Sequence, residues 1–295
     1  MHLARVSQLS VIRHLMSMQA LNRTPFCALK SNWHLYACEA IELALFMLSA
    51  CAFTVFLFDP SWPTLHLFPS AMIRRALMGI AMGMTAILII RSPMGKRSGA
   101  HFNPVITLTY FRLGKIDLWD AVYYVFFQFL GGVLGVAVAA AIFGSSLSKP
   151  AVHYVVTIPG QYGTIAAFFA ELFMATVLMT LILLLSNRVN LAAYASYSIG
   201  VLIALCVFFF APVSGFSINP ARTAGSAFFA GVWTSGWLYF VAPSLGMFGA
   251  AEIYVRLNGN HVLCAKIHPD PAFPCHFLCH FPGHRHITAP HADNI

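Results

Sequence analysis

Two short segments of the chain carry the same pattern of polar residues around an Asn-Pro pair. The first, SGAHFNPVIT, runs from Ser98 to Thr107, and the second, SGFSINPART, runs from Ser214 to Thr223. Aligned without gaps, they share Ser, Gly, Asn, Pro and Thr at the same five places. Asparagine is a good helix N-cap and proline suits the first helical turn, so each pair predicts the start of a helix.

The two asparagines, Asn103 and Asn219, have side chains that could bind a small polar solute. If each amide oxygen caps its own helix, its N–H groups stay available to a solute. Each helix N-terminus adds about half a positive charge, so paired termini would orient water and repel cations and protons. A single pair would be read as an ordinary cap, but the repetition favours a paired site. The apolar segments contain no nucleophile–base pair or phosphate-binding loop, so we expect neither an enzyme nor a cofactor.

The composition places these pairs in a membrane protein. Of the 295 residues, 59% are hydrophobic and 9% are charged, whereas soluble domains carry about 25% charged residues. A bilayer core of about 30 Å needs about 20 apolar residues per helix. The sequence predicts six such spans, at about 37–58, 74–92, 119–143, 163–186, 192–212 and 232–256. The apolar segments 103–112 and 219–230 are too short to cross, so we expect each to be a half-helix.

The basic residues predict the orientation of these spans. Four of the 17 Lys and Arg residues fall on one side, and the remaining 13 fall on the other side or in the two ends of the chain. The positive-inside rule then places both termini in the cytoplasm. Although the net charge is +8, the basic residues form no stripe, so we do not expect nucleic-acid binding.

The two halves of the chain are expected to form an inverted repeat, over about 36–143 and 163–256. Each half has three spans and one half-helix, and an odd number of spans gives the halves opposite topology. Inverted repeats whose broken helices meet near mid-membrane are typical of transport pathways. A coupled secondary transporter is an alternative, but it would need more buried charge near the midplane than the spans provide.

Acidic residues occur early in two of the predicted spans, Glu42 in the first and Glu171 in the fourth. We interpret them as equivalent positions of the two halves. An acid inside a membrane is costly and is usually functional or tightly paired. We expect each carboxylate to accept backbone N–H groups from a non-helical loop, and a proton relay is the alternative.

Taken together, SGAHFNPVITL, SGFSINPART and the acidic segments AIELALF and FAELFMAT resemble the aquaporin family, the major intrinsic proteins. The resemblance covers about residues 36–257. It implies an all-α membrane fold of six tilted helices and two re-entrant half-helices, with one pore per subunit of a homotetramer. It also implies a passive water channel in the plasma (inner) membrane that excludes ions and protons.

The resemblance further implies roles for individual residues. Asn103 and Asn219 would be paired donors at the middle of the pore. Arg222 would be the arginine of the outer selectivity constriction. His101 would line the inner vestibule, with an ordinary loop histidine as the alternative.

Several positions depart from the family pattern. Val105 replaces the usual alanine of the first motif, where two extra methyl groups would affect the meeting of the half-helices. Val207 stands where strict water channels often have histidine, Phe216 is the loop partner in the filter, and Met82 or Gly83 is the partner from the second span. A filter without histidine would be wider and more apolar.

The sequence predicts water as the solute, with another small neutral solute as the alternative. Glycerol facilitators usually have aspartate after the filter arginine, whereas this chain has Thr223, which favours water. The apolar filter favours the alternative of another neutral solute, such as glycerol, ammonia, hydrogen peroxide or a metalloid hydroxide.

The two ends of the chain lie outside the resemblance. Residues 1–35 predict a basic cytoplasmic arm, and residues 258–295 predict a cytoplasmic tail rich in His, Cys and Pro. In that tail, Cys275, His276, Cys279 and His280 have the ligand density of a zinc or copper site. Because prolines interrupt the tail and no paired Cys-x-x-Cys frames it, we expect it to be unstructured. A metal site, which would suggest a metal sensor or metalloenzyme, and lipid-linked cysteines are the alternatives.

Overall fold

The computed structural model describes residues 24–259 and 262–284, and the long elements among them are all helices. Within these described residues, six helices are long and apolar enough to cross a membrane: α2 (Pro25–Phe58), α4 (Ala71–Arg91), α7 (Leu118–Phe143), α9 (Gly163–Ser186), α10 (Ala195–Ser214, preceded by the 3₁₀ turn η2, Ala192–Tyr194) and α12 (Leu238–Asn258). Short elements join them: α3 (Thr64–Leu67), α5 (Pro93–Ser98), α8 (Ser145–Ser148) and η1 (His153–Val155). The prediction of six membrane-spanning helices is confirmed.

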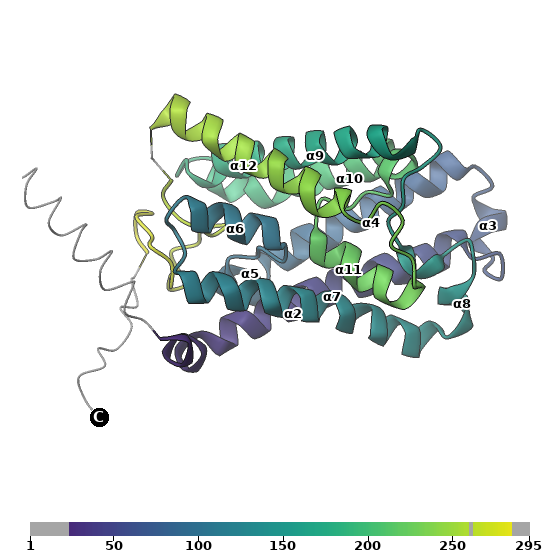
Figure 1. Ribbon diagram of the computed structural model, residues 1–295, viewed down its shortest axis with the longest axis horizontal. Coiled ribbons are helices and arrows are strands. Elements are labelled where there is room, and N and C mark those ends of the chain that lie inside the picture. Colours follow the sequence, from purple (N-terminus) through teal and green to yellow (C-terminus); the bar gives the residue numbers. More distant parts are fainter. Residues whose placement is uncertain (1–23, 260–261, 285–295) are drawn as a thin grey trace, which may run out of the picture.

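Two further helices are half the length of a span and begin at the Asn-Pro pairs. They are α6 (Pro104–Arg112) and α11 (Pro220–Ala230), of 9 and 11 residues. In Figure 1, α6 extends inward from the end of the molecule where the tail lies, and α11 extends inward from the opposite end. The predicted pair of re-entrant half-helices is therefore present, and their N-termini meet in the interior.

The contacts between helices repeat in the two halves of the chain. Helix α2 packs on α7 in the first half as α9 packs on α12 in the second, and α4 packs on α10 between the halves. Each half-helix also packs on a long helix of the opposite half: α11 packs mainly on α7, and α6 packs on α12 as well as on α7 of its own half. This exchange locks the halves together and fixes both half-helices in place.

Glycines allow the close approach that the exchange requires. A Cβ added to Gly132 of α7 would lie 2.5 Å from the carbonyl oxygen of Ala221 in α11. In the reverse direction, a Cβ on Gly225 of α11 would lie 2.4 Å from the carbonyl oxygen of Gly132. Small residues let membrane helices pack with their backbones in contact, so these two glycines hold a half-helix against a span.

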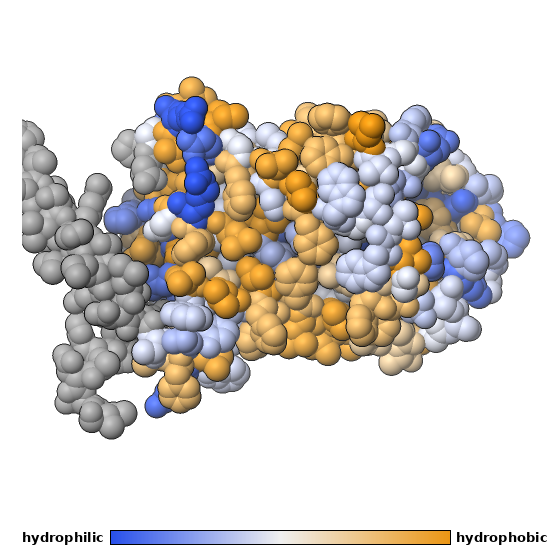
Figure 2. All heavy atoms as spheres, viewed as in Figure 1, coloured by the Kyte–Doolittle hydropathy of each residue, from blue (hydrophilic) through white to orange (hydrophobic). Residues whose placement is uncertain are grey.

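The outer surface matches a lipid environment. Figure 2 shows an apolar band around the middle of the visible face, with hydrophilic residues gathered at the two ends. Every long helix contributes large exposed apolar side chains to the surface, among them Leu45, Leu88, Phe126, Phe169, Phe209 and Leu245. Such an extensive exposed apolar surface indicates contact with a membrane.

The first long helix begins earlier than the sequence predicted. Thr24 caps α2 by accepting a hydrogen bond from the N–H of Cys27 (3.3 Å), and Pro25 occupies the first turn. Residues 25–35, predicted as part of an arm, are therefore helical. Tyr36 stacks on Tyr123 of α7 with 5.2 Å between ring centroids, and this aromatic packing supports the polar extension of the helix.

The prediction of an unstructured tail is wrong for residues 262–284. This segment lies against the ends of the helices at one end of the molecule (Figure 1) and includes fully buried side chains such as Cys264 and Lys266. Leu263 N–H donates to Asn187 Oδ1 (2.5 Å), and Leu278 N–H donates to the carbonyl of Lys115 (3.1 Å). Residues 262–284 contain no long elements, but hydrogen bonds to the helix bundle order them.

Candidate pore and its selectivity residues

The loops that precede the two half-helices have the same unusual backbone. Each starts at a glycine with positive φ, Gly99 (103°) or Gly215 (77°). Two non-glycine residues with positive φ follow in each loop: Ala100 and Phe102 in the first, Phe216 and Ile218 in the second. Left-handed backbone costs about 1–3 kcal/mol at a non-glycine residue and persists where the surrounding structure enforces it. Both loops are therefore held in shape by other groups.

Buried carboxylates enforce that shape. Glu171 accepts the N–H groups of Ser217 (2.9 Å) and Ile218 (2.5 Å). Glu39 does the same in the first half, accepting the N–H groups of His101 (3.0 Å) and Phe102 (2.6 Å). Both glutamates are completely buried, so each satisfies two loop donors that no water reaches.

The interpretation of Glu42 as the equivalent of Glu171 is wrong, because Glu39 takes that position. Glu42 lies one helical turn further along α2, where Ser98 Oγ donates to its Oε1 at 2.8 Å. Its Oε2 is buried without a hydrogen-bond partner. In the second half, Glu171 also accepts the equivalent serine hydroxyl, from Ser214 (2.7 Å). In the first half, Glu39 and Glu42 thus share the contacts that Glu171 makes alone in the second half.

The two asparagines cap their own half-helices and also bond to the opposite loop. Asn103 Oδ1 accepts the N–H of Val105 (2.9 Å), while its Nδ2 donates to the carbonyl of Ile218 (2.8 Å). Asn219 Oδ1 accepts the N–H groups of Ala221 and Arg222 (3.0 and 3.2 Å), and its Nδ2 donates to the carbonyl of Phe102 (2.7 Å). Both amides are thereby fixed, with one N–H of each left over.

A narrow cavity of about 40 Å³ runs past both asparagines. One water requires about 10–15 Å³ of such space, so the cavity holds a few waters. Its polar lining consists of Asn103, Asn219, Ser217 and His101. Its apolar lining comes from Phe46, Ile90, Phe102, Ile106, Leu178, Ile182, Ile199, Ile203, Phe216, Ile218 and Ile267.

Arg222 follows directly on the second Asn-Pro pair, in the first turn of α11. Its guanidinium donates to the carbonyl of Val155 (2.7 Å) and to Ser226 Oγ (3.4 Å). The side chain is 8% exposed. Two hydrogen bonds to α11 and η1 therefore hold a buried positive charge next to Asn219, although Arg222 itself does not belong to the cavity lining.

The other predicted filter residues differ in their placement. Phe216 lines the cavity, whereas Val207 and Met82 are buried and do not belong to its lining. Gly83, the alternative to Met82, lies against α10, since a Cβ there would be 2.4 Å from the carbonyl oxygen of Gly200. Val105 is also buried (2% exposed) and away from the cavity lining.

His101 lies at the end of the cavity near the tail. Its Nδ1 is 3.1 Å from Thr107 Oγ1, and its Nε2 is 2.7 Å from the carbonyl oxygen of Ala265 in the tail. The ring also stacks between Tyr110 and Phe277, at centroid distances of 5.2 and 5.8 Å. His101 thus connects the first half-helix, the cavity and the tail.

Ile267 of the tail completes the lining at this end, which we call the tail-side mouth and define by Ile90, His101, Ile182 and Ile267. All four residues are at most 1% exposed. The Ile267 N–H donates to the carbonyl of Gly99 (3.0 Å), and its carbonyl accepts from Ser186 Oγ (2.9 Å). Nothing in the sequence pattern pointed to Ile267, because it lies in a segment expected to be unstructured.

The predicted metal ligands of the tail are only partly brought together in the structure. Cys275 and Cys279 come together, as their spacing suggested, but with Cys264 and His284. Of the other two candidates, His276 lies with its ring centroid 5.7 Å from that of His34. His280 Nδ1 lies 3.4 Å from Lys115 Nζ.

Comparisons with known proteins agree with this geometry. The sequence model described as "Major intrinsic protein" matches residues 28–254. Aquaporin Z of Rhodopseudomonas palustris is 30% identical over 199 residues, covering 65% of this chain and 82% of that protein. Glycerol uptake facilitator protein-like 6 of Lactiplantibacillus plantarum is 34% identical over 177 residues, covering 59% of this chain and 81% of that protein.

The fold is similar to that of the aquaglyceroporin from Plasmodium falciparum. The TM-score is 0.63 at 20% identity, over 76% of this chain and 96% of that one. The family match spans both half-helices and all six long helices almost completely. The chain therefore belongs to the major intrinsic protein family, and it is a multi-pass membrane channel that passes small solutes passively rather than an enzyme.

Proposed function

We propose that the protein is a water channel, and the crossed hydrogen bonds of Asn103 and Asn219 are the observation that carries this proposal. Each amide donates one N–H to a carbonyl of the opposite loop and has a second N–H left at the cavity. Isoleucines and Leu178 line the cavity without offering donors or acceptors. A water at this point accepts hydrogen bonds from both asparagine N–H groups, so both of its own hydrogens point away from the pair. This orientation interrupts a chain of proton transfers.

Positive charge gives a second reason for ion exclusion. The N-termini of α6 and α11 both end at this pair of asparagines, and each contributes about half a positive charge. Arg222 adds a full charge, buried and fixed by Val155 and Ser226. A cation would lose hydration in the narrow cavity and meet like charge there, so neutral solutes pass and cations do not.

Water is preferred over larger solutes because the cavity is narrow. At about 40 Å³ it admits waters one after another. Thr223 takes no part in solute contact: its hydroxyl is 2.6 Å from Ser217 Oγ and 2.9 Å from Thr157 Oγ1. The alternative is a channel mainly for glycerol or another neutral solute, which the apolar Phe216 in the cavity lining favours.

The orientation and assembly belong to the same proposal. The start of α2, the end of α12 and residues 262–284 lie at one end of the molecule (Figure 1). Basic residues lie there too: Lys96 is ion-paired with Asp270 of the tail, and Arg188 follows Asn187, which accepts the Leu263 N–H. We propose that the protein lies in the plasma membrane and that this end faces the cytoplasm. A homotetramer with one pore per subunit is the proposed assembly.

The test is osmotic shrinkage of proteoliposomes in a stopped-flow instrument, with water and glycerol gradients measured side by side. The full chain is compared with Ile267→Gly, which removes the side chain at the tail-side mouth, and with empty vesicles. Water permeability above the empty-vesicle level in either protein, with glycerol permeability at that level, supports the proposal. Glycerol permeability that rises as much as water permeability supports the alternative.

A further inference from the structure

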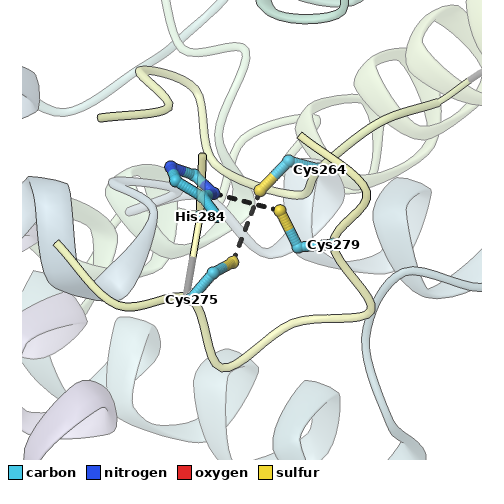
Figure 3. A group of neighbouring side chains, drawn as sticks. All are labelled: Cys264, Cys275, Cys279 and His284. Carbon is cyan, nitrogen blue, oxygen red and sulfur yellow. Dashed lines mark hydrogen bonds between the residues drawn. The ribbon is translucent and has the colours of Figure 1, made fainter. Parts of the chain in front are cut away.

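The tail contains a group of metal-binding side chains that the pore does not use. Cys264, Cys275, Cys279 and His284, here called the thiol cluster, offer one ligand atom each, and these atoms all lie within 4.8 Å of one another. Figure 3 shows the four side chains converging on one point from separate parts of the tail. They are 0%, 1%, 2% and 8% exposed, respectively.

The spacing of the ligand atoms fits a tetrahedral metal ion. Cys264 Sγ and Cys275 Sγ are 3.5 Å apart, and Cys279 Sγ and His284 Nδ1 are 3.1 Å apart. With metal–sulfur bonds of about 2.3 Å and metal–nitrogen bonds of about 2.0 Å, tetrahedral ligands lie roughly 3.5–3.8 Å apart. These two distances need to change by only a few tenths of an ångström, and the remaining pairs, all within 4.8 Å, by about 1 Å at most. Three cysteines and one histidine form a common ligand set of structural zinc.

Two backbone groups point at the sulfur atoms from the positions expected around a metal thiolate. The Lys266 N–H donates to Cys264 Sγ (3.4 Å), and the Phe281 N–H donates to Cys279 Sγ (3.4 Å). In both cases the donor lies two residues after the cysteine. Hydrogen bonds of this kind favour the charged thiolate over the thiol, which is the form that binds metal.

A buried positive charge lies close to the cluster. A zinc ion with three thiolates and a neutral imidazole has a net charge of minus one. Lys266 is completely buried, and its ammonium donates to the carbonyls of Lys96 (2.6 Å) and Pro274 (2.9 Å), the latter next to Cys275. A buried ammonium is costly unless an opposite charge compensates it, and a metal centre with a net charge of minus one would supply that charge.

The tail also needs a source of stability other than secondary structure. Residues 262–284 contain no helix, and their only strand-type pairing is an isolated bridge at Cys275. Segments this short rarely hold a buried core without a disulfide or a metal. All cysteines of the cluster are free thiols, and in a cytoplasmic location they would stay reduced.

The ordered tail spans the tail-side mouth of the pore. Ile267 is hydrogen bonded to Gly99 on one side of the mouth and to Ser186 on the other. Asp270 continues this attachment with an ion pair to Lys96 (3.0 Å). Only two residues separate Ile267 from Cys264, so the order of the cluster and the position of Ile267 are linked by a very short piece of chain.

We propose that the thiol cluster binds one zinc-type divalent ion, and that the bound ion holds the tail as a cap that closes the tail-side mouth. Loss of the ion frees residues 262–284 and opens the pore. The metal site stands on the geometry of the tail alone, whereas closure rests on the proposed channel function. The two parts therefore need separate measurements.

The metal site is tested on the purified full chain by elemental analysis, and by absorption spectroscopy after exchange with Co²⁺. We expect one metal ion per chain, and thiolate-to-cobalt charge-transfer and tetrahedral d–d bands. Cys279→Ser should lose both signals, and His284→Cys, which keeps four ligands, should retain metal. Cys27→Ser removes an exposed cysteine outside the cluster and is the matched control. Equal metal content in wild type and Cys279→Ser, or a Cys264–Cys275 disulfide in the reduced preparation, overturns the metal site.

The cap is tested by amide hydrogen exchange of residues 262–284, a readout independent of transport. Exchange should be slow in the zinc-loaded protein and at least tenfold faster after chelation. Exchange that is equally slow in both overturns the cap, even if metal binds.

Closure is tested by the water permeability of proteoliposomes holding the full chain. Chelation should raise it several-fold in wild type and leave Ile267→Gly, already open, unchanged. Permeability that rises in Ile267→Gly but not on chelation of wild type overturns closure by the metal. Permeability at the empty-vesicle level in all samples overturns the channel proposal instead, and leaves the metal content and exchange results to decide the site and cap.

Discussion

Asn103 and Asn219 are bound reciprocally, because each amide donates to the carbonyl of the residue that precedes the other. The distances are 2.8 Å to Ile218 and 2.7 Å to Phe102. Each asparagine therefore caps its own half-helix and restrains the opposite one. The pore centre is built from two loops that cannot move independently.

Asn219→Asp tests this arrangement, because a carboxylate keeps the cap but cannot donate to Phe102. We expect destabilisation by about 1–3 kcal/mol from the buried carbonyl left without a donor, lower water permeability and a higher cation leak. Thermal unfolding in detergent and vesicle assays with a pH-sensitive dye measure these effects. Asn258→Asp, at the exposed end of α12, is the control, and an equal effect there would contradict the prediction.

Glu39 and Glu42 make different contacts, so the same substitution by glutamine should change the stability of the protein differently at the two positions. Glu39→Gln replaces one acceptor by an N–H group facing loop donors, and should destabilise the protein by about 1–3 kcal/mol. Glu42→Gln leaves an acceptor for Ser98 and removes a carboxylate oxygen without a partner, so stability should stay the same or rise. Thermal unfolding distinguishes them, with Glu171→Gln expected to resemble Glu39→Gln. Similar losses for Glu39→Gln and Glu42→Gln would show that the assignment is wrong.

Arg222→Val should loosen the selectivity of the pore. The substitution removes a fixed charge and the two hydrogen bonds to Val155 and Ser226. We expect glycerol and proton permeability to rise above the empty-vesicle level while water permeability persists. Arg188→Val, at an exposed turn, provides the control. Unchanged glycerol and proton permeability would show that Arg222 does not form the selectivity constriction.

Val105→Ala should affect stability and leave selectivity unchanged. The valine is buried and away from the cavity lining, so its loss removes apolar contacts worth about 1.5 kcal/mol, at about 0.8 kcal/mol per buried methyl(ene) group. The ratio of water to glycerol permeability should equal that of the wild type. A changed ratio would mean that Val105 narrows the path of the solute.

The sequence predicts the bundle well because membrane depth leaves the backbone few options. Apolar runs of about 20 residues must be helices, and the two Asn-Pro pairs start helices whose lengths are half a span. The predicted half-helices 103–112 and 219–230 agree with α6 and α11 within one residue at each end. Local chemistry, namely a cap followed by proline, determines these starts.

Features that depend on long-range contact were not predictable in the same way. Glu39 and Glu42 lie one turn apart on the same helix, and only the position of the loop from His101 to Asn103 decides which one receives its N–H groups. The filter partner from α4 has the same problem, since only the packing of α4 on α10 shows that neither Met82 nor Gly83 lines the cavity.

The tail was mispredicted because its order comes from residues that are far apart along the chain. Cys264 and His284 lie 11 residues before Cys275 and five residues after Cys279, so no short motif contains the cluster. The adjacent His276 and His280 looked equally suitable as ligands. Docking on the helix ends, through Ile267 and its neighbours, decides which side chains converge.

The temperature dependence of water permeability tests the central claim most directly. Water crossing lipid must leave its hydrogen-bonded surroundings, whereas water in the pore exchanges them for Asn103, Asn219 and loop carbonyls. Proteoliposomes with the metal-free full chain should therefore show an activation energy close to that of water diffusion in bulk solution, well below that of empty vesicles. The same activation energy in both, at equal permeability, would contradict the claim that this chain is a water channel.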